Sequence, residues 1–385
     1  MNNSTDFKIG TNFTNVTNNF RQDIPILGWT IAVLLTNSCG ALANILLLLT
    51  LILHKPLRQS SSSSLIVHTV CLDLYISSFA VPVTVIPIFL GPLYELPQWF
   101  CQYQFLYVQM VYQIEMYAAT MLALHRVAAA VSPRFFIHMT STAAMILMNA
   151  LPWVIAMVNC LLPAVGNMGY QMVFNQLNGG CMYSVNGTAG AALALANTSV
   201  GIYFPTAVMG AAYGVFLLET WRHSGLQMSR ARRRRLELSR TMLILFVWHC
   251  VSLYPSSIMV GLFPNVFASN LGLQLAFKYL GNSCSAINPV FCWCSSKLFQ
   301  DGTRAVLRKL RRCVSGGCQS GGQVKPSSTA REHSAGEPTR SLGQPNGNGM
   351  EADGIKILTL RRLVLRWTDF RIILSPLLST ARRPT

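Results

Sequence analysis

Seven long apolar segments constrain the fold of this chain more than any other feature. A helix needs about 20 predominantly apolar residues to cross the hydrocarbon core of a membrane. Open-edged or irregular backbone is not tolerated in contact with lipid, so each segment is predicted to be helical. The sequence therefore predicts an all-α membrane protein, a seven-transmembrane-helix bundle over residues 27–295. Its spans are Leu27 to Leu53, Leu65 to Leu90, Gln102 to Val131, Ala143 to Val165, Ala192 to Trp221, Leu238 to Phe263 and Leu271 to Cys294.

The composition agrees with a membrane protein and excludes a typical soluble one. Hydrophobic residues make up 51% of the 385 residues and charged residues only 11%, whereas soluble domains carry about 25% charged residues. The formal net charge of +17 raises the question of a nucleic-acid partner. The basic residues stand in short runs between apolar segments, which is typical of the cytoplasmic edges of membrane proteins, and we expect no nucleic-acid binding.

The basic residues also predict the orientation in the membrane. The predicted loops around Gly91–Trp99, Gly166–Gly190 and Pro264–Asn270 contain no Lys or Arg. Cytoplasmic loops carry an excess of Lys and Arg. We therefore expect a multi-pass protein of the plasma membrane, with the N-terminus extracellular and the C-terminus cytoplasmic. The basic positions on the inner side are Lys55, Arg58, Arg126, Arg134, Arg230, Arg232 to Arg235, Lys297, Arg304, Arg308, Lys309, Arg311 and Arg312.

Glycosylation signals and two cysteines fall on the predicted outer side. Residues 1–26 are predicted to form an extracellular glycosylated segment, and the second outer loop adds a further sequon. Asn197 also begins a sequon, but it lies within the fifth span and is expected to be unmodified. Cys101 and Cys181 fall in predicted outer loops, where one disulfide is expected. The predicted glycosylation sites are Asn2, Asn3, Asn12, Asn15 and Asn186.

The segment after the seventh span is predicted to lie on the inner membrane surface. Residues 296–313 alternate apolar and basic side chains in a pattern typical of an amphipathic helix bound to lipid. Cys313 and Cys318 follow it and are either palmitoylated or reduced thiols. Residues 314–385 are expected to be mostly disordered, because much of this tail is rich in Gly, Ser and Pro.

Each span also carries one or two polar, aromatic or proline residues in a characteristic order. With these residues the chain resembles the rhodopsin-like class of G-protein-coupled receptors over residues 27–312. The resemblance implies a receptor that transmits the binding of an extracellular ligand to heterotrimeric G proteins, and no enzyme activity. The residues that carry it are Asn44, Asp73, Arg126 with Pro133, Trp153, Pro205 with Tyr213, Pro255, and Asn288 with Pro289.

The resemblance assigns the conformational switch to Arg126, Tyr213, Asn288, Pro289 and Pro255. In such receptors the arginine contacts the G protein when the sixth span moves outward; the alternative is that Arg126 only reaches the inner headgroups. The chain also departs from the family pattern at several switch positions. His125 replaces the acid that precedes the arginine, as in some subfamilies such as melatonin-like receptors, and we expect elevated ligand-independent signalling. The other departures are Val127, Arg235, His249, Leu253 and Cys292.

A pair of acids in the predicted bundle core forms a possible cation site. The resemblance places a sodium ion near Asp73, and Glu115 stands where relatives have a small hydroxyl residue. Ser285 and Asn288 are expected close by. Two carboxylates in a dry bundle do not both ionise without a cation between them. The pair therefore predicts tight cation binding or a proton-sensitive switch; the alternative is a protonated Glu115 bonded to a neighbour, with no signalling role.

The resemblance places a ligand pocket in the outer half of the bundle. Lys278 pairs with an acidic ligand group there or reaches the outer headgroups. A retinal pigment is excluded, because the position of its lysine holds Asn282, and Val108 replaces the aspartate that anchors amines. Five other polar side chains line this pocket or form interhelical hydrogen bonds. They are Gln109, Tyr112, Gln113, Ser256 and Ser257.

Three alternatives to a signalling receptor have different support. A non-signalling seven-helix decoy, or a modulatory partner of another receptor, is kept open by the altered switch positions. A transporter or channel is disfavoured because the two halves of the chain show no internal repeat. The chain also lacks the motifs of a nucleophile with its base, a phosphate-binding loop or a zinc-binding helix. The identity of the ligand and the class of G protein do not follow from the sequence.

Overall fold

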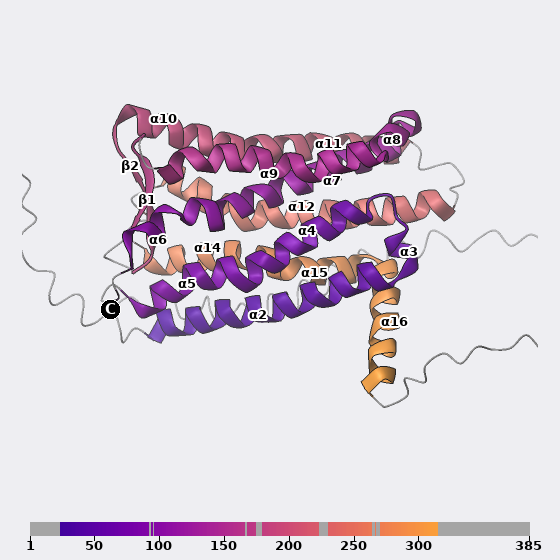
Figure 1. Cartoon of the computed structure of the whole chain (residues 1–385), viewed down its shortest axis with the longest axis horizontal. Coiled ribbons are helices and arrows are strands. Elements are labelled where there is room, and N and C mark those ends of the chain that lie inside the picture. The colour runs from indigo at the N-terminus through magenta and orange to yellow at the C-terminus, as the bar shows by residue number, and fades with distance from the viewer. Residues whose placement is uncertain are drawn as a thin grey trace, which may run out of the picture. The chain divides into compact units, whose positions relative to one another are not determined.

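The computed structural model describes residues 24–91, 94, 96–165, 168–174, 179–222, 230–263, 266 and 270–314. Helical rods lie side by side and form one bundle (Figure 1). In chain order the rods are α2 (Ile24–Leu53); α4 (Ser63–Tyr75), η2 (Ile76–Ala80) and α5 (Val81–Leu90); α6 (Gln98–Gln102), η3 (Phe105–Gln109) and α7 (Met110–Val131); α9 (Thr142–Val165); α10 (Gly187–Thr198), η4 (Ser199–Tyr203) and α11 (Phe204–Arg222); α12 (Arg230–Leu262); and α14 (Leu271–Asn282) with α15 (Cys284–Ser295).

Six of these rods are long and apolar enough to cross a membrane as single helices, within the described residues. The seventh is broken at Ser283, where the Oγ atom bonds the carbonyl of Tyr279. Neither half spans a bilayer alone, but residues 271–295 together rise about 37 Å at 1.5 Å per residue. The predicted seven-helix membrane bundle is therefore confirmed, with its last span made of two stacked helices.

Two spans contain a π-helical turn that ends two residues before a proline. The turn η2 precedes Pro82, and η4 precedes Pro205. Proline removes one backbone hydrogen bond and clashes with the preceding turn, so a locally widened helix accommodates it. These turns were not expected from the sequence, which predicts uninterrupted helices there.

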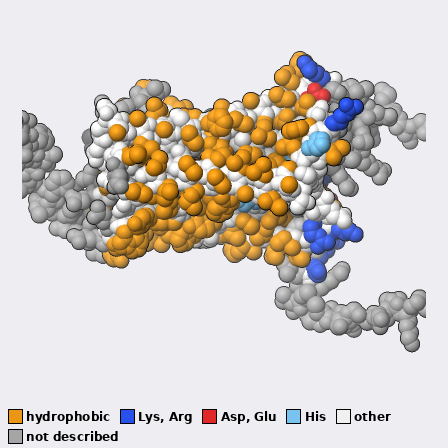
Figure 2. Space-filling view, turned by 45° about the horizontal axis from the view of Figure 1, so that its top comes forward, with side chains coloured by type: hydrophobic (Ala, Val, Ile, Leu, Met, Phe, Trp, Pro, Cys, Tyr) orange, Lys and Arg blue, Asp and Glu red, His pale blue; other side chains and the backbone are white. Residues whose placement is uncertain are grey.

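Two short elements at one end connect the rods, and a third lies across them. The helices α3 (Lys55–Arg58) and α8 (Pro133–Met139) follow the first and third spans. The helix α16 (Lys297–Val314) runs across the end of the bundle (Figure 1), in agreement with the predicted amphipathic helix. Lys and Arg side chains gather at this end, while apolar side chains cover the middle (Figure 2). We call it the basic end.

The opposite end carries a small β-hairpin, which lies in a loop of the otherwise helical chain. Strands β1 (Tyr170–Phe174) and β2 (Cys181–Val185) pair antiparallel, with Tyr170 opposite Val185 and Phe174 opposite Cys181. The pairing satisfies the backbone groups of a long loop that would otherwise have no partners. We call this the hairpin end.

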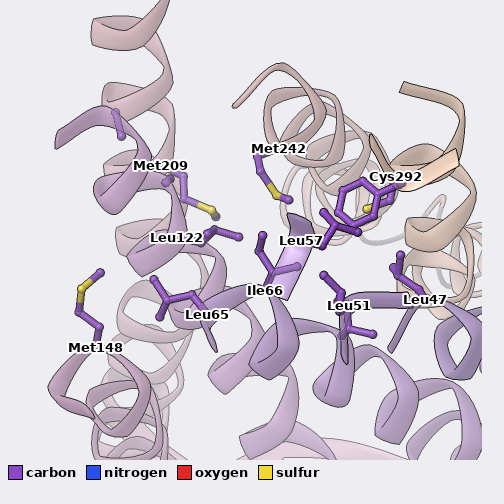
Figure 3. Packing of buried hydrophobic residues seen from close by; sticks show 14 of the residues in the cluster. Leu47, Leu51, Leu57, Leu65, Ile66, Leu122, Met148, Met209, Met242 and Cys292 are labelled. Atoms are coloured by element: carbon purple, nitrogen blue, oxygen red, sulfur yellow. The ribbon is translucent and has the colours of Figure 1, made fainter. Parts of the chain in front are cut away.

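Apolar side chains from most rods fill the inside of the bundle near the basic end. Leu51, Leu65 and Phe299 are at most 1% exposed, and Leu122, Met209 and Met242 pack in the same cluster. Figure 3 shows that Leu122, Ile66 and Met242 point toward one another from separate helices. Because Phe299 belongs to α16, this cluster also holds the transverse helix against the bundle.

The first and seventh spans approach each other closely at a glycine. A Cβ atom on Gly40 would lie 2.3 Å from the Cβ of Ala286. Small residues let the backbones of two helices come together and gain van der Waals contact, which replaces the hydrophobic effect inside lipid. One turn deeper, Asn44 donates to the carbonyl of Ser285 at 3.2 Å. This contact fixes α15, which carries several of the candidate site residues.

Candidate coupling and ligand sites

The predicted disulfide joins the hairpin to the third span. The sulfur atoms of Cys101 and Cys181 are bonded, which ties β2 to α6. Phe105 packs edge-on against Tyr170 at 5.3 Å between ring centroids and tilted against Tyr183 at 5.8 Å. Burial, with the nearby Cys160 thiol, raises the pKa of the Tyr170 phenol to about 12, so this ring stays neutral at physiological pH. The hairpin is thus packed through its aromatic rings, an aromatic cover, against the outer part of the third span.

The two predicted core acids lie together in the middle of the bundle. Asp73 and Glu115 are 3% and 4% exposed, and their carboxyl groups interact directly. Ser285 donates from Oγ to Oε1 of Glu115 at 3.2 Å, and Asn288 donates from Nδ2 to Oδ1 of Asp73 at 2.8 Å. The structure therefore brings together all four residues of the predicted cation site.

A cavity continues from this acid pair toward the basic end. Its walls are mostly apolar, and Asp73, Glu115 and Asn288 supply its polar side. Tyr213 and His249 also face it. The cavity connects the acid pair with residues of the predicted switch, and residues of α11 and α12 line it together.

His249 of α12 bridges two other helices through both nitrogens of its ring. One nitrogen contacts the sulfur of Met116 on α7, and Nδ1 lies 3.5 Å from the thiol sulfur of Cys284 on α15. The sequence identifies His249 only as a departure from the family pattern. The structure shows that it ties the sixth span to the third and the seventh.

Arg126 is buried near the basic end, 4% exposed. Its guanidinium lies close enough to the Tyr213 hydroxyl and to His125 to interact electrostatically with both. An arginine that only reached the inner headgroups would be exposed. The burial of Arg126 therefore argues against the alternative that it serves only to reach those headgroups. Pro255 lies inside α12 and Pro289 inside α15, as expected for the two helices of the predicted switch.

His125 is fully buried and makes its contacts away from any carboxylate that the structure describes. Its Nδ1 lies 3.0 Å from Oγ of Ser62, the residue before α4. Its ring packs edge-on against Phe136 of α8, with 5.1 Å between centroids. Nothing in the sequence indicates these two contacts, because Ser62 lies 63 residues before His125 and Phe136 lies in the separate short helix α8.

Some predicted pocket residues already form hydrogen bonds or apolar contacts, either between helices or within one helix. Gln113 is 6% exposed and accepts a 2.8 Å hydrogen bond from Nδ2 of Asn159. Asn159 and Asn197 also exchange side-chain to backbone hydrogen bonds, so the sequon at Asn197 lies inside the bundle, away from glycan-transferring enzymes. The hydroxyl of Ser257 bonds the carbonyl of Leu253, and Val108 is 2% exposed in an apolar cluster.

The remaining pocket residues keep side chains that are at least partly accessible. Gln109, Tyr112 and Ser256 are partly buried, and Lys278 is exposed. Asn282 lies one turn below Lys278, and its Nδ2 atom is buried without a hydrogen-bond partner in the described structure. Among the modification sites, Asn186 is exposed directly after β2. Asn2, Asn3, Asn12, Asn15 and Cys318 lie outside the described residues, as does the side chain of Cys313.

The geometry of buried Arg126, the acid pair and the proline-bearing spans agrees with one known family. The family model described as "7 transmembrane receptor (rhodopsin family)" matches residues 43–291, nearly two thirds of the chain. The chain belongs to the rhodopsin family of seven-transmembrane receptors. Among curated proteins, none matches the chain. The family match confirms the resemblance seen at Asn44, Asp73 and Asn288, and makes this receptor a multi-pass membrane protein.

Proposed function

We propose that this receptor transmits the binding of an extracellular ligand at the hairpin end to a heterotrimeric G protein at the basic end. The observation that carries the proposal is the burial of Arg126 beside Tyr213, at the inner end of the third span. A buried cation within a membrane bundle is costly and is a functional candidate by default. Outward movement of α12 would uncover it for a partner protein.

The orientation follows from three features at opposite ends. Lys55, Arg58 and Arg134 lie at the basic end, which the excess of Lys and Arg assigns to the cytoplasm. The disulfide and the exposed sequon Asn186 lie at the hairpin end, which an oxidising extracellular environment suits. The N-terminus is then outside and the C-terminus inside the plasma membrane.

The receptor works by a shift between two states of the bundle. A ligand that binds the active state more tightly than the inactive one raises the population of the active state. Proline-bearing α12 and the break at Ser283 supply places where the sixth and seventh spans bend. His249, bonded between Met116 and Cys284, is the contact that must change when α12 moves.

The pair Asp73 and Glu115 is proposed to hold one cation, either a proton or a sodium ion. The burial of the two carboxyls close enough to interact supports this, since two bare carboxylates in one dry site repel each other. The carboxylate oxygens and the Ser285 hydroxyl would bind a sodium ion, which prefers hard oxygen ligands as other hard cations do. Loss of the cation would leave the acid pair with an additional negative charge in the shared cavity. The bundle would then shift away from the state that binds the cation.

The alternative of a non-signalling decoy or modulatory partner rests on the altered switch residues alone. Leu253 and Cys292 differ from the family pattern, but both pack within the same apolar cluster. No contact in the described structure favours this alternative over a signalling receptor.

Nucleotide exchange on purified G proteins tests the proposal. Full-length receptor in lipid nanodiscs is mixed with heterotrimers of each Gα class, and GTP-analogue uptake is compared with that of the Arg126→Ala variant. Acceleration by the wild type and not by the variant supports coupling. Equal rates in every class would reject it. Epitope tags at the two termini, stained on intact and permeabilised cells, test the orientation.

A further inference from the structure

Lys278 faces the inside of the bundle and not the lipid. Successive residues of an α-helix are turned by about 100° around its axis. Tyr279, about 100° to one side of Lys278, contacts the first span, since its hydroxyl lies 3.0 Å from Oγ1 of Thr36. Gly281, about 60° to the other side, faces the sixth span, where Leu253 and Ser252 are its neighbours. Lys278 lies between these two directions and therefore points toward the bundle axis.

Lys278 is nevertheless exposed. A side chain that points inward and is accessible must lie in an opening of the bundle. It stands ten residues before Asn288, about 15 Å closer to the hairpin end at the helical rise. The opening therefore lies at the hairpin end, in the same half of the bundle as the aromatic cover of Phe105, Tyr170 and Tyr183.

Within the described residues, neither Lys278 nor the amide nitrogen of Asn282, one turn below it, has an acceptor. In the described part of the chain, Lys278 makes no ion pair and no side-chain hydrogen bond. Asn282 lies about 40° around the helix and about 6 Å deeper, and its Nδ2 atom is buried and unpartnered. Glu115 cannot serve Lys278, because its partner Ser285 lies seven residues, or about 10 Å, further in.

We propose that Lys278 and Asn282 bind the anionic group of the receptor's ligand, a carboxylate or phosphate on an apolar or aromatic body. An ammonium and an amide N–H, four residues apart on one helix face, are two donors for the oxygens of one anion. A buried donor without an acceptor is unfavourable, and an anion with two or more oxygens removes that cost at both residues. The ligand class rests on the proposed function, because it assumes that the hairpin end receives the ligand.

Binding to the purified full-length receptor in nanodiscs tests this without a G protein. The probes are sodium benzoate, phenyl phosphate and the neutral analogue benzamide, and the readout is the midpoint of thermal unfolding, which a bound ligand raises. The variants are Lys278→Met, Lys278→Arg and Asn282→Ala. The matched control is Lys55→Met, which removes a lysine at the basic end.

We expect benzoate and phenyl phosphate to raise the midpoint of the wild type and of Lys55→Met, and benzamide to raise it less. Lys278→Met should lower the affinity for both anions by roughly tenfold or more, Lys278→Arg should retain it, and Asn282→Ala should weaken it partly. A preference for one anion over the other distinguishes a carboxylate ligand from a phosphate ligand.

Three results would overturn the proposal: equal anion affinity in wild type and Lys278→Met, equal binding of benzamide and benzoate, or no midpoint change with any anion while unfolding stays cooperative. These outcomes are independent of coupling. A receptor that couples through Arg126 but binds no anion refutes the ligand class alone, whereas one that binds anions but activates no G protein refutes the proposed function alone.

Discussion

The Nδ1 atom of His125 lies 3.0 Å from the hydroxyl oxygen of Ser62, and this pair joins the inner end of the third span to the start of the second. An acid at this position would sit beside Arg126 and restrain it by charge. The His125 ring instead bonds Ser62 and packs on Phe136. The helix turn around Arg126, residues 123–129, therefore contains no acid.

Replacing His125 with an acid should lower basal signalling. In His125→Asp the carboxylate attracts the Arg126 guanidinium, which favours the inactive state, and the Ser62 hydroxyl can still donate to it. We expect basal second-messenger levels to fall toward those of mock-transfected cells at matched surface expression. The control is His138→Asp, which adds the same charge at an exposed site of α8. Unchanged or higher basal levels in His125→Asp would contradict the idea that the absence of an acid at position 125 raises basal signalling.

A side chain at Gly40 should prevent assembly of the first and seventh spans. In Gly40→Val the new Cβ would meet Ala286 at 2.3 Å, and backbone cannot yield by that much without separating the helices. We expect a large loss of surface expression and a lower unfolding midpoint. Gly28→Val is the control, because nothing lies within 4 Å of a Cβ there. Similar expression of the two variants would mean that the close approach is unimportant.

Loss of the Asn159 amide should destabilise the outer half of the bundle. Asn159→Ala leaves the carbonyl oxygen of Gln113 and the backbone oxygen of Asn197 without their donor. Unsatisfied buried groups cost about 1–3 kcal/mol each, although interhelical hydrogen bonds in membranes average about 0.6 kcal/mol. We expect a total cost of about 1–2 kcal/mol, measured by unfolding in detergent. Asn149→Ala, which removes a hydrogen bond to exposed Ser64, should cost less; the reverse order would refute the assignment.

Neutralising one core acid should remove the dependence on cations. Glu115→Gln keeps the size of the side chain and a carbonyl oxygen that accepts from Ser285, but it removes one of the two charges beside Asp73. We expect the response of basal activity to sodium and to pH to be reduced together. A loss of only the sodium response identifies sodium as the cation, and a loss of only the pH response identifies a proton. If both responses persist unchanged, the pair has no cation-linked role.

Much of the bundle could be predicted from the sequence because lipid restricts its options. Hydropathy alone places each span within a few residues, and the core acids Asp73 and Glu115 were expected to meet. What the sequence left open depends on the rotation and breaks of individual helices. For Gln113 the sequence predicts either a pocket position or an interhelical hydrogen bond. The rotation of α9 about its own axis decides between them, because it places Asn159 next to Gln113. The break at Ser283 carries no proline or glycine at its own position.

Loop structure was the part that the sequence did not predict. The hairpin at Tyr170–Phe174 and Cys181–Val185 lies in a loop whose residues show no clear alternation. The contact of His125 with Ser62 joins positions 63 residues apart, and a loop hydroxyl gives no pattern by which to identify it. Lone asparagines in apolar spans, such as Asn159 and Asn197, were the available signal for the buried network.

Basal G-protein dissociation in cells tests the central claim most directly. The receptor and its Arg126→Ala variant are expressed at equal, verified surface levels beside sensors for each main Gα class. The account predicts ligand-independent dissociation in at least one class for the wild type, and its loss in the variant, because the proposed function assigns the G-protein contact to buried Arg126 and no acid stands at position 125. Silence in every class, or equal dissociation in both proteins, would contradict it.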